Sequence, residues 1–331
     1  MRASANRREL PVTGHGIQRR SGRFLALALW AGGALLEFNP VNAAARPAAI
    51  DFCRQTSQNA LRSCQAGARS DDLLSLGKCN NIADPVARKA CKQQALVDLK
   101  DAQQTCNAQF DARQTVCARL GGAPYDPVID PNNFVTTIDN PYFPLTPGTT
   151  RTYEAQTAGG VIRNVVAVTH DTVVILGVTC VEVHDVVFTN GEVTEDTLDW
   201  FAQDKVGNVW YFGENTRKLA GGLTVSVEGT FTAGVNGDKA GIIMKAHPAI
   251  GDYFRQEFVL AQGEDVEEVI GLNESVTVPY GSFDHCLKVQ ETTALEPDTV
   301  VHDFYAPGIG PVLSIDMPSN ERLELVQMTT Q

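Results

Sequence analysis

The fold of the first third of this chain is determined by residues 53–117, which read CRQTSQNALRSCQAGARSDDLLSLGKCNNIADPVARKACKQQALVDLKDAQQTCNAQFDARQTVC. Six cysteines occur in this stretch at successive spacings of 11, 15, 12, 15 and 11 residues. The position numbers of the outermost, middle and innermost pairs each sum to 170, as they do for residues that face each other across an antiparallel hairpin. Six cysteines allow about fifteen complete pairings. The symmetry favours the nested one: Cys53 with Cys117, Cys64 with Cys106 and Cys79 with Cys91.

Helix signals on both sides of this symmetry indicate two antiparallel helices. Asp84 has the character of an N-cap before Pro85 at the first helical position, and Gly121 ends the helical pattern that follows. In the opposing arm, residues 70–72 (Ser-Asp-Asp) are expected to break the helix and to start a short one that ends at Gly77. Cysteines 11 residues apart are about three helical turns apart, so both cysteines of an arm point to one side.

The sequence therefore predicts a disulfide-stapled helical hairpin over residues 46–122. A pair of helices this thin buries little core, and crosslinks are the usual remedy. The segment contains no Cys-x-x-Cys redox pair, haem attachment sequence or zinc-type cluster. We interpret its cysteines as structural and the hairpin as a spacer or a protein-docking arm.

Residues 1–45 have the features of a secretion signal. Arg19, Arg20 and Arg23 precede the apolar run Phe24–Leu36, and small residues follow at Asn42–Ala45. The apolar run is shorter than the roughly 20 residues that span a bilayer. All eight cysteines lie beyond this segment, and paired cysteines are typical of an oxidising compartment. We expect a periplasmic or secreted protein without a membrane span.

Charge is distributed unevenly along the chain, whose formal net charge is -12. Residues 46–127 hold 11 basic and 8 acidic side chains, whereas residues 128–331 hold 10 basic and 29 acidic ones. Such an acidic surface repels phosphate backbones and anionic headgroups, so nucleic acid is not an expected partner. Cations and basic polymers are compatible with it, and so is a role in solubility alone.

The composition and the hydrophobic periodicity of the sequence change after the hairpin. Prolines at 127, 131, 141, 144 and 147 exclude long helices and predict an extended connector over residues 123–150. From residue 151 to 331 short apolar-alternating segments are separated by turn signals, with no strand-helix alternation. The sheet should be antiparallel. We expect an α+β protein in which a curved antiparallel sheet, a half-barrel or open barrel, follows the helical hairpin.

One β-hairpin in this sheet could carry chemistry. Asn190-Gly191 between apolar runs favours a two-residue type I′ turn, and that turn places residues whose numbers sum to 381 opposite each other. Glu182 then faces Asp199 on the same surface as His184 and Glu195. Opposed carboxylates with an imidazole can hold a divalent cation or act as acid and base. A solvated strand face has the same sequence pattern, and a one-residue slip would scatter the group.

Cys180 and Cys286 remain after the hairpin cysteines are assigned. Each begins or lies within a predicted strand, and we expect a disulfide between two distant strands of the sheet. The alternative is a metal site formed by Cys180, His184, His285 and Cys286.

Aromatic residues suggest a ligand pocket if the sheet is curved. Phe201, Trp210 and Phe212 are the candidates to line its concave face, although core packing also accounts for them. The sequence contains no nucleophile elbow, phosphate loop or dinucleotide fingerprint. Their absence lowers the expectation of an enzyme without excluding one.

Three motifs carry a resemblance to known proteins over residues 139–326. Asn140–Leu145, Asp199–Glu214 and Tyr305–Gly310 resemble an uncharacterised family of exported bacterial proteins. In shape, the chain more loosely resembles the LolA/LolB-like lipoprotein carriers, and this implies a half-barrel that holds an apolar ligand. The chain departs from the carriers in its stapled hairpin, its expected sheet disulfide and its acidity. The resemblance implies no catalytic residues.

The sequence favours an exported, non-enzymatic binding or structural protein whose sheet holds a small apolar ligand or another exported protein. It implies no cofactor, although a divalent cation is compatible with it. The alternative function is a metal-dependent or carboxylate-based hydrolase. Its candidate residues share the predicted hairpin face: Glu182, His184, Glu195 and Asp199.

Overall fold

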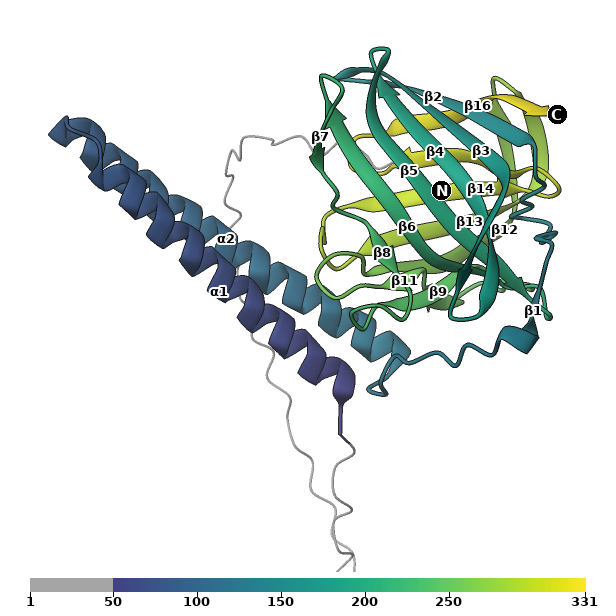
Figure 1. The fold of residues 1–331 in the computed structure, drawn as a ribbon, viewed down its shortest axis with the longest axis horizontal. Helices are drawn as coiled ribbons and strands as arrows, with labels where there is room; N and C mark the ends of the chain where they lie inside the picture. Colours follow the sequence, from purple (N-terminus) through teal and green to yellow (C-terminus); the bar gives the residue numbers. More distant parts are fainter. Residues whose placement is uncertain (1–49) are drawn as a thin grey trace, which may run out of the picture. The chain divides into compact units, whose positions relative to one another are not determined.

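The computed structural model describes residues 50–331, so the expected secretion signal lies outside the described residues. Two helices are followed by sixteen strands, and residues 51–331 form one compact unit (Figure 1). This confirms the expected fold class, a helical hairpin followed by a curved antiparallel sheet. Neither helix is long and apolar enough to cross a bilayer.

The two helices begin and end close to the predicted signals. Helix α1 spans Phe52–Asn80 and helix α2 spans Pro85–Leu120, with Asp51 and Asp84 as N-caps that accept backbone hydrogen bonds. The expected break at residues 70–72 is wrong, because α1 is continuous there. Ser and Asp favour helix starts, but Ser70 and Asp71 are exposed and Asp72 is half-buried. The local preference is overridden where crosslinks hold the helix on both sides.

Three disulfides join the helices in the nested order. They connect Cys53 with Cys117, Cys64 with Cys106 and Cys79 with Cys91, at Cα–Cα distances of 5.6, 5.7 and 5.6 Å. The nearly equal distances show that the two helices keep a constant separation at the three bridges. Few other side chains are buried between the helices, so the crosslinks replace a core.

The connector and the sheet follow. A short 3-10 turn at Pro131–Asn133 leads into a strand that pairs with the sheet. The strands are β1 Phe134–Val135, β2 Thr149–Thr157, β3 Gly160–Ile175, β4 Val178–Thr189, β5 Glu192–Asp204, β6 Val209–Ala220, β7 Leu223–Ser226, β8 Phe231–Thr232, β9 Lys239–Met244, β10 Tyr253–Arg255, β11 Glu257–Phe258, β12 Asp265–Val278, β13 Gly281–Thr293, β14 Val300–Ala306, β15 Gly310–Asp316 and β16 Glu321–Thr330.

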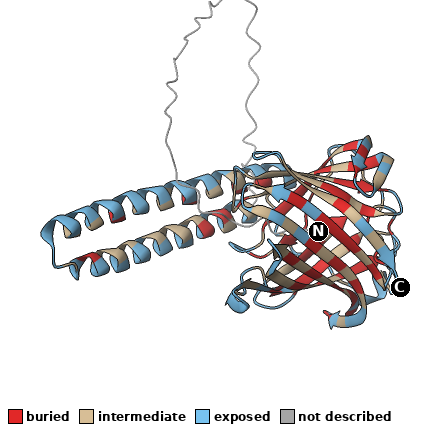
Figure 2. Cartoon of the chain, turned by 90° about the horizontal axis from the view of Figure 1, so that it is seen from above, coloured by how far each residue is buried: buried red, intermediate tan, exposed pale blue. Residues whose placement is uncertain are grey.

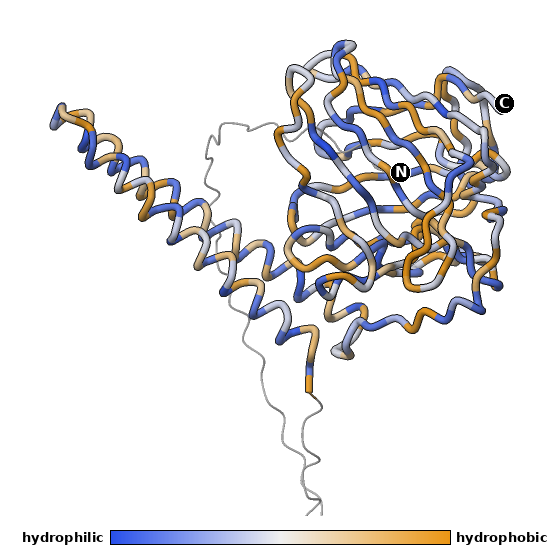
Figure 3. Tube along the Cα trace, viewed as in Figure 1, coloured by the Kyte–Doolittle hydropathy of each residue, from blue (hydrophilic) through white to orange (hydrophobic). Residues whose placement is uncertain are grey.

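The strands form one antiparallel sheet that is nearly closed into a barrel. Its order is β10-β12-β13-β14-β15-β16-β2-β3-β4-β5-β6-β9-β11, with β1, β7 and β8 attached at β5 and β6. Two meanders, β2–β6 and β12–β16, are joined by pairing of β16 with β2. The first strand of this order, β10, contacts β9, which is the second-last strand, and this contact brings the two ends of the sheet together. Polar and apolar residues alternate along the strands (Figure 3), so each strand presents one face to the interior.

The core has two layers, one on each face of the sheet. The larger layer lies on the inner face and includes Val183, Phe201 and Tyr305, together with Phe143 from the connector. The smaller layer lies on the outer face, where Phe134 of the connector packs against Phe212 at 5.5 Å between ring centroids. Figure 2 shows buried residues concentrated in the barrel and at the end of the hairpin that meets it.

Candidate functional site

The β4–β5 hairpin confirms the predicted turn but not the predicted register. Asn190 and Gly191 have φ values of 53° and 87°, as a two-residue type I′ turn requires. Beside the turn Phe188 pairs with Val193, as expected. A β-bulge then leaves Thr194 without an opposite residue on β4, and every later pair is shifted by one residue.

The expected pairing of Glu182 with Asp199 is therefore wrong. Glu182 is opposite Trp200, and its carboxylate accepts a hydrogen bond from the indole Nε1 at 3.2 Å. Asp199 is opposite Val183 and is buried on the inner face. Because side chains alternate between the faces of a strand, the one-residue shift sends the two carboxylates to opposite sides of the sheet.

The other two candidates are divided in the same way. His184 lies on the outer face, with Nε2 2.8 Å from Oδ1 of Asp196, which also pairs with Arg217. Glu195 lies on the same inner face as Asp199, because both are on β5 and every second side chain of a strand points to the same side. The four predicted residues are not brought together, and residues 50–331 contain no group of three metal-ligating side chains with the spacing of an ion site.

The inner face instead carries a carboxyl pair that the sequence did not predict. Asp199 and Glu214 are cross-strand partners on β5 and β6, and the Tyr211 hydroxyl lies 2.8 Å from an oxygen of each. A phenol can donate its one proton to only one carboxylate, so a protonated second carboxyl satisfies both contacts. Burial and the neighbouring Glu214 raise the pKa of Asp199 well above its usual range.

Asp185 extends this polar group onto β4. The Asn164 amide donates a hydrogen bond to its carboxylate. Burial raises the pKa of Asp185 to about 7, against the lowering effect of the Asn164 hydrogen bond. A second pair lies on the other meander, where Glu267 is opposite Glu291 and Gln256 Nε2 donates to both carboxylates, at 2.5 and 3.0 Å. Burial also raises the pKa of Glu267.

The expected disulfide between Cys180 and Cys286 is wrong, because both are free and buried. Cys180 lies on β4 in the outer layer of the core, whereas Cys286 lies on β13 in the larger layer. Five strands separate β4 from β13 in the sheet order. Burial raises the pKa of the Cys180 thiol to about 12 and that of Cys286 to about 11, so both are neutral and poorly reactive. The alternative metal site is also wrong, since His285 contacts Asn273 instead.

The aromatic candidates do not line a common surface. Phe201 faces the interior, stacked on Tyr211 at 5.0 Å between ring centroids. Trp210 and Phe212 lie on the outer face and pack against Phe134 of the connector. Phe201 pairs with Tyr211 of β6, and Trp210 and Phe212 are the neighbours of Tyr211 along the strand, so they lie on the opposite face.

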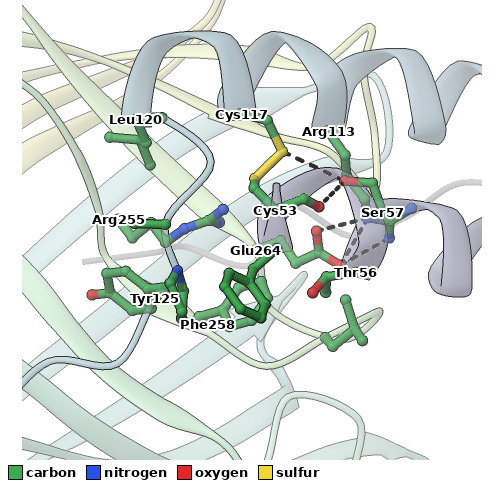
Figure 4. A pocket seen from close by; sticks show the side chains of 15 residues that line it. Cys53, Thr56, Ser57, Arg113, Cys117, Leu120, Tyr125, Arg255, Phe258 and Glu264 are labelled. Atoms are coloured by element: carbon green, nitrogen blue, oxygen red, sulfur yellow. Dashed lines mark hydrogen bonds and ion pairs between the residues drawn. A yellow bond between two sulfur atoms is a disulfide. The ribbon is translucent and has the colours of Figure 1, made fainter. Parts of the chain in front are cut away.

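A pocket of about 270 Å³ lies where the hairpin meets the barrel (Figure 4). We call it the junction pocket. Its walls are the first turn of α1, the last turns of α2, the start of the connector, and residues around β10 and β11. Most of the lining is apolar, and much of its rim is exposed. The larger apolar side chains are Phe52, Leu120, Pro124, Tyr125, Phe258 and Leu260, and Ala123 and the Cys53–Cys117 bridge add to them.

Two arginines bring charge to the junction pocket. Arg113 of α2 forms a forked ion pair with Glu264, with N···O distances of 2.8 to 3.1 Å, and both are buried. Glu264 also accepts a hydrogen bond from the Ala261 amide at 2.7 Å. Arg255 of β10 points into the pocket (Figure 4). Unlike Arg113, Arg255 has no hydrogen bond or ion pair with any residue of 50–331, and its Nε is fully buried.

Only one feature of the sequence points to this site, and it does so indirectly. Arg255 is one of 10 basic residues among the 204 that follow the hairpin region, and it stands in an aromatic segment, Tyr253-Phe254-Arg255. A basic side chain inside an apolar strand of an acidic domain needs a buried partner. Nothing in the sequence connects it with Arg113 or Glu264.

Comparison with known proteins identifies no family. No protein-family model matches the chain, and no curated protein sequence matches it. Among solved structures, that of a "putative lipoprotein" from Parabacteroides distasonis matches with a TM-score of 0.32 and 15% identity, covering 57% of this chain and 98% of that chain. The barrel-like sheet agrees with the curved sheet that the sequence resemblance implied, but these comparisons do not show the LolA/LolB-like family.

Proposed function

We propose that this protein is an exported, non-enzymatic binding protein that holds a small organic ligand in the junction pocket. One observation carries the proposal: the pocket is lined by both the stapled hairpin and the barrel, and it contains a buried arginine whose Nε has no hydrogen-bond acceptor among residues 50–331. Ligand pockets are mostly apolar and carry a few oriented polar groups. The junction pocket has this composition, with a volume near the lower end of the usual range.

Export is supported by the three hairpin disulfides, because such bridges persist in oxidising compartments. A binding role is favoured over the hydrolase alternative because the register places Glu182 and His184 on the face opposite to Asp199. No acid-base pair with a reachable substrate position is formed by these residues. The barrel then serves as a rigid wall on which the base of the hairpin closes the pocket.

The proposal is tested with N-phenyl-1-naphthylamine, a neutral apolar dye that fluoresces when it leaves water. The mature protein should bind the dye, and Ala123→Trp, which fills the pocket from its rim, should abolish the fluorescence. Ala220→Trp is the matched control, since Ala220 is exposed at the end of β6. Equal dye binding by the two variants would place the site elsewhere and overturn the proposal.

A further inference from the structure

We propose that the junction pocket selects a small organic monocarboxylate with an aromatic or branched apolar body, and that Arg255 binds the carboxylate. This inference rests on the proposed function and adds the chemical class of the ligand. It starts from an unusual feature of the pocket: a buried guanidinium that finds no acceptor in the described part of the chain.

Arg255 is 8% exposed, yet none of residues 50–331 accepts a hydrogen bond from its guanidinium. Arginine has five N–H donors and stays protonated in proteins, and a buried charge without a partner is costly. Glu264 and Glu257 act on this charge only through space. Glu264 is held by Arg113 and by the Ala261 amide, and Glu257 accepts a hydrogen bond from the Asp265 amide. An anion in the pocket would supply the missing acceptor.

The aromatic neighbours leave one side of the guanidinium for this anion. The Arg255 Cζ lies over the Phe258 ring at 4.6 Å from its centroid and 5.4 Å from that of Tyr125. The two rings contact each other edge to face at 5.9 Å. Aromatic faces engage the flat side of a guanidinium, whereas its N–H groups point outward in its plane. A carboxylate in that plane can accept two parallel hydrogen bonds.

The charges around the pocket favour one negative charge on the ligand. Glu264 neutralises Arg113, which leaves Arg255 as the unneutralised cation among the lining residues. Both Glu264 and Glu257 act on Arg255 through space. They would repel a second negative charge placed beside it. A dianion such as a phosphate monoester is therefore disfavoured relative to a carboxylate.

The rim determines the rest of the ligand. Phe52, Leu120 and Leu260 are 43%, 37% and 40% exposed, and all three line the pocket. Apolar surface at the mouth of a concave site gains stability when a ligand covers it. A pocket of about 270 Å³ accommodates a small ring or a short branched chain. The preferred ligand therefore combines a carboxylate at the inner end with an apolar body at the rim.

The test compares three probes of the same length: 4-phenylbutyrate, the neutral 4-phenylbutyramide and the cationic 4-phenylbutylamine. Calorimetric titration of the mature protein should show the carboxylate binding at least tenfold more tightly than the amide, with no binding of the amine. Arg255→Gln should remove the preference for the carboxylate over the amide. Arg217→Gln is the matched control, because Arg217 is exposed on the outer face, and it should leave the preference unchanged.

Two further measurements separate the possible failures. Arg255→Lys keeps the charge without the planar fork, so it should retain a reduced preference if the protein folds normally. N-phenyl-1-naphthylamine should still bind to Arg255→Gln, which shows that the pocket is intact. Dye binding without any preference for the carboxylate would overturn the present inference alone. Absence of dye and probe binding in the unmodified protein would overturn the proposed function as well.

Discussion

In an antiparallel hairpin the numbers of facing residues have a constant sum, and this rule holds throughout the α1–α2 hairpin but only near the turn of the β4–β5 hairpin. In the helices, the three cysteine pairs that sum to 170 are all bridged. In the strands, pairs that sum to 381 occur only at Phe188–Val193 and Thr189–Glu192, and the bulge at Thr194 shifts the others. A covalent bond fixes the first register, whereas a backbone turn fixes the second for only two pairs.

A shift of one residue in register has different consequences in the two hairpins. Moving by one residue turns a helical side chain by about 100°, so it can still reach the neighbouring helix. Moving by one residue in a strand sends the side chain to the other face. This is why the sequence predicted the disulfides correctly but wrongly placed Glu182, His184, Glu195 and Asp199 on one face. Four predictions test the comparison, from the largest expected effect to the smallest.

The largest effect is expected at the contact between the two regions. Arg113→Ala should lower the free energy of unfolding by about 3–5 kcal/mol, because it leaves the buried Glu264 carboxylate without its counter-ion. Arg119→Ala removes the more exposed pair with Glu268 and should cost about 1 kcal/mol or less. Urea unfolding measures both. Equal costs would show that the hairpin is not held to the barrel through Arg113.

Removal of single bridges tests whether crosslinks replace a core in the hairpin. Cys53→Ala/Cys117→Ala opens a bridge with a sequence separation of 64, and Cys79→Ala/Cys91→Ala opens one with a separation of 12. Because Cys64–Cys106 stays closed, the outer bridge closes a ring of about 24 residues, 12 from each helix. Loop-closure entropy then predicts a loss of about 3.5 kcal/mol for the first variant and of about 3 kcal/mol for the second. Hydrogen exchange of the helix amides would report the loss. A larger effect of the inner bridge would contradict this account.

Asp185 tests the inner-face assignment through pH. Its pKa of about 7 in the folded protein exceeds the value of about 3.9 in an unfolded chain. The folded state therefore binds this proton more tightly, and the associated stability is lost as pH rises from about 4 to about 7. From pH 5 to pH 8 the loss should be about 2–3 kcal/mol.

The matching variant is Asp185→Asn, which should abolish this part of the pH dependence of urea unfolding. Asp171→Asn is the control, because Asp171 is exposed in β3, and it should change little. If the two variants show the same pH dependence, the carboxyl of Asp185 is not buried on the inner face.

The smallest effect is expected from deletion of Thr194. The later pairs, such as Val183 with Asp199, can keep their register without the bulge. The cost should be about 1 kcal/mol, for the hydrogen bond from Thr194 Oγ1 to the Val187 carbonyl. Deletion of Ala202 is the control, and it should be far more destabilising because part of the strand must change faces. Comparable urea midpoints for the two deletions would contradict the bulge assignment.

Local signals predicted the elements well wherever they acted over a few residues. Asp84 with Pro85, Gly121, and the Asn190–Gly191 turn all lie where the sequence placed them. The expected break at residues 70–72 was wrong because neighbouring bridges override a weak preference. The expected disulfide of Cys180 with Cys286 was wrong because an even count of cysteines says nothing about their distance in the sheet.

The junction pocket could not be predicted in the same way. Its charged residues, Arg113, Arg255 and Glu264, come from a helix, a short strand and a loop, separated by up to 151 positions. Each of them is an ordinary surface residue by composition alone. Only the packing of the hairpin base against the barrel buries them together, and it leaves the Arg255 guanidinium without an acceptor among the residues that the structure describes.

The sequence by itself determined the disulfide pairing, the two helices, the antiparallel class of the sheet and the tight turn of β4–β5. These depend on spacing, caps and turn residues, whose effects are settled within a few neighbouring positions or by a covalent bond. The tertiary structure decided the strand register past Thr194, the fate of Cys180 and Cys286, and the position of the pocket. These depend on bulges and on long-range packing, in which a shift of one residue exchanges the interior of the barrel for its surface.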